Sequence, residues 1–345
     1  MEILKQLSEA NGVSGAESEV RQVILDLIRP HVDEIQTDTL GSVIALKRGT
    51  GGSDLRVMVD AHMDEVGMMV VGHDSNGMLR IVSVGGLDTR LMPGLRVQVG
   101  PDRIPGVIGV KPIHLAKNGD MDKAGEFESL RVDIGASGKD AAKSKAPIGT
   151  RIAFHSEFIE GETSALGKAF DDRAGCAVLV HLLQGEPFPF DLYASFTLQE
   201  ELGLRGARAA AHAIEPDVAV ALEGTIADDL PKEDDESPTT RLGAGPALSV
   251  VDRSVIYDRR LNRLLTQTAE ELGLPVQFKQ PGIGGTNAGS IALSGVGVPV
   301  ACIAVPCRYI HSPAAMLSKG DYHNAIRLLR ESLARLDESV LAQPV

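Results

Sequence analysis

The sequence predicts an α/β protein: a mostly parallel sheet flanked by helices, with a small β-barrel domain inserted into it. In the second half of the 345-residue chain, unbroken apolar strand-like runs alternate with helical patterns, which is typical of a buried parallel sheet with helices on both faces. Between residues 68 and 151, short β-branched runs are separated by clusters of Gly, Pro and Asp, which is typical of a small barrel or sandwich. We therefore expect one domain formed by residues 1–67 and 152–345, and an inserted β-rich domain formed by residues 68–151.

The first half of the chain begins with two predicted helices, because apolar residues recur at helical spacing from Ile3 to Leu7 and from Val20 to Ile28. Strands are expected at 42–47 and 55–59, and the second leads directly into Asp60-Ala61-His62. Within the insert, strands are expected at 67–71, 79–84, 95–99, 106–110 and 130–134, with no long helix. The run 151–154 marks the return to the α/β pattern.

The second half supplies the remaining elements of the sheet and its cover. Helices are expected at 174–183, 206–214, 256–272 and 321–341, and strands at 191–198, 218–222, 276–279 and 298–305. Two charged stretches, 120–128 and 231–238, are expected to be loops.

Composition excludes several classes of function. The chain has 34 Lys and Arg against 47 Asp and Glu, a net charge of −13, which argues against a general affinity for nucleic acid or anionic membrane. Its three cysteines lie in apolar segments without C-x-x-C spacing, so free buried thiols in a reducing compartment are expected. No basic start followed by an apolar stretch and no run of membrane-spanning length is present. We expect a cytoplasmic protein.

The candidate site residues gather where strands end. Lys168-Ala-Phe-Asp-Asp-Arg-Ala-Gly175 carries two adjacent carboxylates before an apolar helix, and by themselves these are equally well explained as helix caps. The other candidates follow apolar strand-like runs: His62 with Asp64, Glu200 with Glu201, Glu223, and His311. Because open α/β sheets bind ligands at the carboxyl ends of their strands, these residues predict a site for two divalent metals that share one carboxylate.

Each candidate also has a structural explanation. A histidine near a strand end is often structural, but in His62-x-Asp64 the carboxylate can hold one ring nitrogen while the other binds a metal. Glu200 and Glu201 follow a strand in which neighbours face opposite sides, so one can bind metal while the other addresses a water. A solvent-facing strand end is the alternative. The glycine-rich run 282–287 is either a close approach to the site or an ordinary loop.

Five motifs in order resemble the TET, or glutamyl-aminopeptidase, family of di-metal exopeptidases, some of which have been labelled endoglucanases. They are 61–65 (AHMDE), 168–173 (KAFDDR), 199–203 (QEELG), 284–286 (GGT) and 308–313 (RYIHSP). The resemblance spans essentially the whole chain. It implies a di-zinc-peptidase fold with a PDZ-like insert, Asp171 shared by two metals, His62 and Glu223 completing one site, and Glu201 and His311 completing the other. It further implies Glu200 as general base and Asp64 as the residue that orients His62.

The chain departs from the family pattern at two positions. Glu223 stands where the family often has Asp, and Asn287 stands where the glycine loop often ends in Asp. Either carboxylate can bind a metal, but the longer arm of Glu223 is expected to alter the geometry or the metal preference. Asn287 removes a charge beside the site, which bears on specificity more than on the chemistry.

The resemblance also implies cofactors, substrates and partners. Two divalent ions per subunit are expected, zinc before cobalt or manganese, acting on short peptide substrates in a homo-oligomer whose insert builds dimers that assemble into a dodecamer. The acidic site would pair with the free α-ammonium group of a substrate, which predicts an aminopeptidase rather than a carboxypeptidase.

Two other classes of function compete with this interpretation. A glycoside hydrolase also uses two carboxylates, but it would leave both histidines without a role, and the chain has 3% aromatic residues and no Trp for sugar stacking. A metal-binding protein without catalytic activity would not need Glu200.

Overall fold

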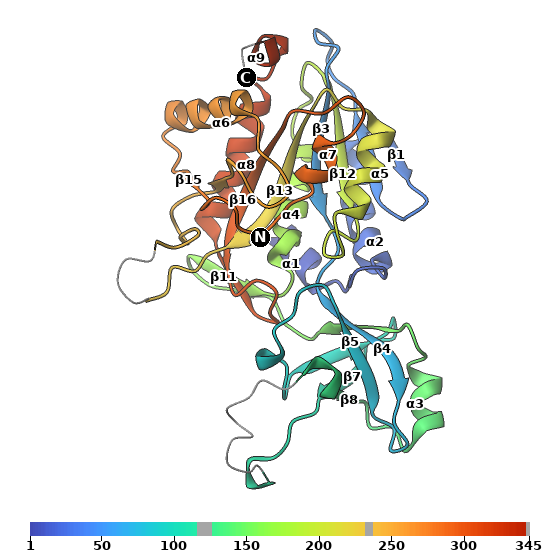
Figure 1. Cartoon of the computed structure of the whole chain (residues 1–345). Coiled ribbons are helices and arrows are strands. Elements are labelled where there is room, and N and C mark those ends of the chain that lie inside the picture. Colours follow the sequence, from blue (N-terminus) through green and yellow to red (C-terminus); the bar gives the residue numbers. More distant parts are fainter. Residues whose placement is uncertain (116–125, 232–236, 343–345) are drawn as a thin grey trace.

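A computed structural model describes residues 1–115, 126–231 and 237–342 of the chain. Within these residues an eleven-stranded sheet carries helices on both faces, and a closed six-stranded barrel lies beyond one end of it (Figure 1). The predicted loops 120–128 and 231–238 fall mostly outside the described residues.

The sheet is mixed, and the parallel strands of its main path lie at the centre. Strands β12 (Asp191–Thr197), β3 (Arg56–His62), β13 (Val218–Ile226) and β16 (Val300–Arg308) run parallel to one another. Antiparallel strands extend both sides: β1 (Glu34–Thr37), β2 (Val43–Lys47), β17 (Ala315–Ser318), β11 (Ser164–Gly167) and β10 (Ile159–Glu160). Off the main path, β14 (Ala247–Leu248) pairs antiparallel with β16 and parallel with β15 (Gln277–Phe278). The expected mostly parallel sheet is therefore correct for the four strands that carry the site.

Helices cover both faces because the central strands are apolar on both sides. One face packs against α1 (Glu2–Glu9), α2 (Ser18–Ile28), α4 (Phe170–Gln184), α6 (Arg259–Leu272) and α8 (Lys319–Leu333). The other face packs against α5 (Arg205–Ile214) and α7 (Ala288–Ala292). Within β3, Val57, Met58 and Val59 are fully buried, as expected for a strand covered on both faces.

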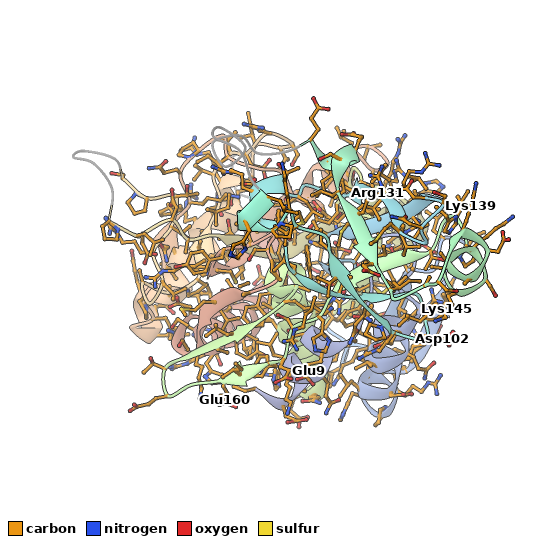
Figure 2. All side chains as sticks on the ribbon, turned by 90° about the horizontal axis from the view of Figure 1, so that it is seen from below. Glu9, Asp102, Arg131, Lys139, Lys145 and Glu160 are labelled. Atoms are coloured by element: carbon orange, nitrogen blue, oxygen red, sulfur yellow. The ribbon has the colours of Figure 1, made fainter. Side chains whose placement is uncertain are left out.

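The barrel is a separate closed unit with its own apolar core. Its strands, in sequence order, are β4 (Gly67–His73), β5 (Leu79–Val84), β6 (Arg96–Val99), β7 (Ile104–Ile108), β8 (Arg131–Asp133) and β9 (Arg151–Phe154). The sequence pattern missed the short helix α3 (Lys139–Lys145), whose Lys139 and Lys145 lie at the outer surface of the barrel (Figure 2).

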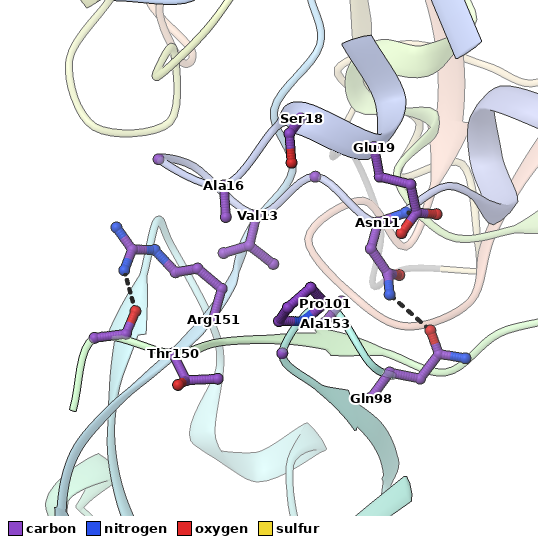
Figure 3. A pocket seen from close by; sticks show the side chains of 14 residues that line it. Asn11, Val13, Ala16, Ser18, Glu19, Gln98, Pro101, Thr150, Arg151 and Ala153 are labelled. Carbon is purple, nitrogen blue, oxygen red and sulfur yellow. Dashed lines mark hydrogen bonds between the residues drawn. The ribbon is translucent and has the colours of Figure 1, made fainter. Parts of the chain in front are cut away.

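The junction between barrel and sheet combines polar contacts with a small apolar cluster of Val13, Val84 and Ala153. Asn11 donates a hydrogen bond of 2.7 Å to Gln98, Arg103 pairs with Glu19, and the Nε of Arg151 donates to the carbonyl of Ser14 at 2.9 Å. A cavity of about 530 Å³ opens between the α1–α2 connection and strands β6 and β9 (Figure 3). None of the predicted metal ligands lines it.

Most predicted elements shift by a few residues in the structure, and three of these differences change the interpretation. The single C-terminal helix expected at 321–341 is two helices, α8 and α9 (Glu338–Ala342). The helix expected from residue 174 begins at Phe170, although Asp171 and Asp172 have non-helical backbone angles. The strand expected at 218–222 continues to Ile226, so Glu223 lies inside β13 instead of after it.

Cys176, Cys302 and Cys307 are free and buried, as predicted. No helix in the described part of the chain is long and apolar enough to cross a membrane.

Candidate metal centre

The predicted ligands meet at the carboxyl ends of the central parallel strands. His62 is the last residue of β3, Glu200 and Glu201 follow β12, Glu223 lies in β13, and His311 follows β16. Asp171 enters from the start of α4, which packs across β13 and β3. Parallel strands bring their carboxyl ends to one edge of a sheet, so residues spread over 250 positions become neighbours.

His62 and Glu223 form what we call the inner ligand pair. The Nε2 of His62 lies 3.1 Å from the Oδ1 of Asp171 and 3.4 Å from the Oε2 of Glu223. Its Nδ1 lies 3.2 Å from the backbone oxygen of Asp64 and 3.4 Å from the Oδ1 of Asp64. An Nδ1–H that donates to Asp64 leaves Nε2 as the nitrogen that faces the carboxylates.

Glu201 and His311 form the outer ligand pair. The Nε2 of His311 lies 3.4 Å from the Oδ2 of Asp171 and 3.3 Å from the Oε1 of Glu201. The Nδ1 of His311 bonds to the backbone oxygen of Gly86 at 2.9 Å. Gly86 follows β5 of the barrel, so the barrel orients one of the sheet's histidines.

Asp64 positions other parts of the site in addition to His62. Its carboxylate accepts hydrogen bonds from the hydroxyl of Ser14 at 2.5 Å and from the backbone N–H groups of Glu200 and Glu201 at 3.0 and 3.3 Å. The fully buried carboxylate therefore fixes the turn that presents both glutamates.

The backbone is strained beside three of the site residues. Ala169, Gln199 and His311 have φ values of 58°, 53° and 58°, in the left-handed region that non-glycine residues rarely adopt. Such strain is typical of positions that orient functional groups. Ala169 precedes Asp171 by two residues, and Gln199 directly precedes Glu200.

Asp172 has a role that the sequence did not reveal. Its carboxylate accepts the backbone N–H of His62 at 3.2 Å and that of Gly175 at 2.8 Å. Its oxygen also lies close enough to His62 and Glu223 to complete a three-residue ligand group. The helix-cap explanation is correct for Asp172, because it caps Gly175, but the same side chain also holds the end of β3.

Two basic side chains from the same motif lie behind the site. The ammonium of Lys168 bonds to both carboxylate oxygens of Glu65, at 2.6 and 2.8 Å, and Arg173 donates to the carbonyl of Met63 at 2.9 Å. All three charged side chains are buried. A buried charge without a partner would be strongly destabilising, so this pairing fixes the backbone on both sides of His62.

The arrangement fits divalent cations. Two atoms about 2.1 Å from one tetrahedral ion lie roughly 3.4 Å apart, and the contacts of the inner and outer pairs measure 3.1 to 3.4 Å. The Oε2 of Glu223 is buried and accepts no hydrogen bond. Imidazole and carboxylate together are ligands that suit zinc and related transition metals.

The pKa values of the buried site residues also indicate that the site fits divalent cations. Burial, followed by repulsion from neighbouring carboxylates, raises the pKa of Glu200 to about 9 and that of Glu201 to about 8. Burial likewise raises the pKa of Glu223 to about 7. Burial opposes the charged form of His311, but its bond to Asp171 and the charge of Glu201 outweigh this and raise the pKa of His311 to about 9. Carboxylates that cannot all ionise together would be relieved by bound positive charge.

The glycine run 282–287 approaches the site, as one of its two interpretations predicted. Gly284, Gly285 and Thr286 line the same cavity as Asp171 and Glu223. Asn287 does not face that cavity: its amide donates to Asp60 at 2.7 Å and to Thr197 at 2.9 Å, behind the strand ends. Asn287, where the family often has Asp, therefore anchors the glycine loop to the strands and does not face the cavity.

Comparison with known proteins identifies the family. Residues 41–328 match the family model described as M42 glutamyl aminopeptidase. The chain belongs to this family. A putative aminopeptidase of Acetivibrio thermocellus is 37% identical over 96% of this chain and 98% of its own. The crystal structure of a TET aminopeptidase from the marine sediment archaeon Thaumarchaeota archaeon SCGC AB-539-E09 superposes with a TM-score of 0.93, at 37% identity, over 99% of this chain and 98% of that one.

A TET1 peptidase of Pyrococcus horikoshii, 30% identical with a TM-score of 0.86, covers 97% of this chain and 99% of its own, and is described as assembling into a tetrahedron or a large octahedral shell. The resemblance to TET peptidases is thus confirmed, and this M42 chain is an aminopeptidase and a hydrolase. Membership of a metallopeptidase family implies divalent metals. The glycoside-hydrolase and non-catalytic interpretations are set aside.

Proposed function

We propose that this M42 aminopeptidase uses Asp171 as the ligand shared by two divalent ions, with the inner pair His62 and Glu223 on one ion and the outer pair Glu201 and His311 on the other. The observation that carries this proposal is the position of Asp171: one carboxylate oxygen faces His62 and the other faces His311. Zinc is the ion we expect, before cobalt or manganese, because affinity follows the Irving–Williams order.

Glu200 acts as the general base and then as the general acid. Its carboxylate lies 4.0 Å from the Nε2 of His62 and lines the same cavity as the proposed ligands. Two divalent cations in such a site lower the pKa of a water and polarise the scissile carbonyl. Glu200 accepts the proton of the attacking water and delivers it to the leaving amine. Asp64 holds Glu200 by its backbone and His62 by its ring, so both keep their orientation through the reaction.

The substrate enters with a free amino terminus. Four carboxylates line the cavity, from Asp171, Glu200, Glu201 and Glu223, and those of Asp64 and Asp172 lie directly beside them. Together these six negative charges exceed the four positive charges of two divalent ions, which leaves carboxylate character to pair with an α-ammonium group. Short peptides are the expected substrates, cleaved in the cytoplasm.

Acetylating the amino terminus of a good peptide substrate should abolish cleavage, and amidating its carboxyl terminus should change the rate little. Peptide release is measured on protein treated with chelator and restored with zinc, cobalt or manganese in turn. A requirement for a free carboxyl terminus would instead favour a carboxypeptidase.

We further propose that residues 68–151 form a dimerisation domain and that the dimers build a dodecamer. The closed barrel has its own core, and a related TET1 peptidase assembles into closed shells. Replacing 68–151 with a short linker should leave a folded species with fewer subunits, so the mass measured by light scattering should fall by much more than the deleted residues account for. Mass is the appropriate readout, because the same replacement removes the Gly86 carbonyl that holds His311.

A further inference from the structure

The glycine loop, residues 284–286, lines the cavity at the metal centre without supplying a ligand. This cavity has a volume of about 350 Å³, and its lining also includes Lys279 and the carboxylates of Asp171, Glu200 and Glu223. A peptide that reaches these carboxylates has to lie in the same small cavity as the loop. The position of the loop therefore affects how tightly a substrate binds.

The backbone of the loop has two free hydrogen-bond donors. In the described part of the chain, no oxygen accepts a hydrogen bond from the backbone N–H of Gly284 or of Gly285. Gly284 has a φ of 68°, which favours a glycine, and neither residue has a side chain that could cover its own backbone. Backbone donors are obligatory hydrogen-bonding groups, so these two are available to a carbonyl oxygen of a bound peptide.

A turn formed by residues 251–257 holds the loop in place. The backbone N–H of Arg253 donates to the carbonyl of Gly284 at 2.9 Å, and that of Gly282 donates to the carbonyl of Val251 at 3.1 Å. Every residue has these backbone groups, so the contacts alone do not explain which side chains the turn requires.

The side-chain connection runs through Tyr257. Its hydroxyl donates to the Oδ2 of Asp252 at 2.6 Å and lies 2.8 Å from the hydroxyl of Thr286. Because the single hydroxyl hydrogen of Tyr257 goes to the carboxylate, Thr286 must donate to the tyrosine oxygen. All three side chains are buried. Breaking the connection would leave the Thr286 hydroxyl buried without its acceptor, which is costly.

Tyr257 is itself rigidly placed. The Oδ1 of Asp252 accepts hydrogen bonds from the backbone N–H groups of Ser254 and Val255, at 2.6 and 3.0 Å, so one carboxylate oxygen fixes the turn and the other fixes the tyrosine. The ring of Tyr257 lies in the apolar core on the α5 and α7 side of the sheet. Thr286, at the cavity, is therefore bonded to a side chain that is anchored in the core.

We propose that Tyr257 is a positioning residue for substrate binding: through Thr286 it holds Gly284 and Gly285 where their backbone N–H groups donate to a carbonyl oxygen of the bound peptide. The proposal rests on the proposed function, because it places the peptide at the metal centre. Tyr257 does not line the cavity and takes no part in bond cleavage.

The test removes one hydroxyl and measures KM and kcat separately on a short peptide with a free amino terminus. Tyr257→Phe keeps the ring in the core and should raise KM by roughly 5- to 30-fold, the range for leaving one buried hydroxyl unpaired. The value of kcat should change by less than about twofold, because binding common to the ground state and the transition state affects KM alone. The metal content measured by atomic absorption should be retained.

Tyr322→Phe is the matched control. Tyr322 is also buried, but its hydroxyl has no hydrogen-bond partner among the described residues. Removing that hydroxyl should leave both KM and kcat unchanged.

Thr286→Val removes the other half of the connection and should raise KM by a similar factor. The double variant Tyr257→Phe/Thr286→Val should raise KM no further than the larger single effect, because both substitutions break the same connection. Effects that multiply in the double variant would overturn the proposal.

Two results with Tyr257→Phe would also overturn it. A lower melting temperature with an unchanged KM would show that Tyr257 supports only the fold, and a loss of metal or of kcat would place its effect at the metal centre. Absence of cleavage of any peptide with a free amino terminus by the wild-type enzyme would instead contradict the proposed function itself.

Discussion

The two proposed ligand pairs of this aminopeptidase are chemically alike but differ in how they are held. The side chain of His62 is 1% exposed, and its Nδ1 is held by Asp64, two residues farther along the same chain segment. The side chain of His311 is 35% exposed, and its ring is held by a carbonyl of the barrel. The inner pair is supported by the sheet alone, whereas the outer pair is oriented correctly only when the barrel and the sheet keep their relative position. We therefore expect the inner ion to bind more tightly than the outer one.

Removing the shared ligand should have the largest effect, because it acts on both pairs. Asp171→Ala should reduce the metal content to one ion per subunit or fewer and abolish turnover. Atomic absorption and peptide release measure the two quantities, and Asp102→Ala, on an exposed turn of the barrel, is the control. Two ions retained at full occupancy would remove Asp171 from the shared position.

Substitutions of the two adjacent glutamates should have different effects on metal content and on kcat. Glu200→Gln should keep both metals and lower kcat by roughly 10²–10⁴-fold, as expected when a general acid–base group is lost. Glu201→Gln should release the outer ion and leave the inner one. Metal content together with kcat separates the two results, and reversed phenotypes would exchange the roles of the two residues.

A substitution at Gly86, which follows β5 of the barrel, should weaken metal binding at the outer pair and leave the inner pair unchanged. A Cβ on Gly86 would stand 3.3 Å from the Nδ1 of His311, closer than an ordinary contact, so Gly86→Ala should displace the ring. The affinity for the outer ion should fall by about 10–100-fold, the range for losing support behind a metal ligand. Gly109→Ala, where a Cβ would make an ordinary 3.5 Å contact, is the matched control. Equal loss from both sites in a metal titration would contradict the division into two pairs.

The smallest effect should appear in the chelated protein as a dependence of its stability on pH. Burial raises the pKa of Glu200 from 4.5 to about 9 and that of Glu201 from 4.5 to about 8, and the bond to Asp171 helps raise that of His311 from 6.5 to about 9. The folded state then holds protons that the unfolded chain has released, so stability should fall as pH rises between these values.

The melting temperature should therefore decrease by several degrees between pH 6 and pH 9 in chelator. Glu201→Gln should reduce this slope, because it removes one of the titrating groups of the outer pair. The metal-loaded protein should show a weaker dependence, since bound cations favour the ionised carboxylates throughout. A melting temperature that rises with pH in chelator would contradict the assignment.

Much of the fold and of the ligand set follows from local pattern. Apolar runs that end in His62 or lead to Glu200 and Glu201 predict side chains at one edge of a sheet, whatever the details of packing. The barrel was predictable because its strands are short and evenly interrupted by turn residues. The position of Glu223 within its strand was harder to predict, because a polar residue at the end of an apolar run does not reveal whether the strand continues past it.

Other contributions depend on tertiary packing and leave no local signal. Gly86 acts through a backbone carbonyl, which every residue possesses. Lys279 is a single cation directly after a two-residue strand, and only the folded structure reveals that it lines the cavity at the metal centre. Asp172 could have been found from its adjacency to Asp171, but the pattern could not tell which carboxylate faces the cavity.

The insertion of the barrel into the sheet also has a consequence for how the chain folds during synthesis. The barrel is contiguous, from Gly67 to Phe154, so it can close as soon as that segment leaves the ribosome. Strand β3 pairs with β12 in a register that joins Arg56 to Asp191, and with β13 farther on. The apolar β3 must therefore wait for well over a hundred residues before its partners exist, and non-local parallel pairing of this kind is slow and exposed to aggregation. We expect nascent chains whose first 160 residues have emerged from the ribosome to contain a folded barrel and an unpaired β3, and to depend on chaperones until β12 and β13 have emerged.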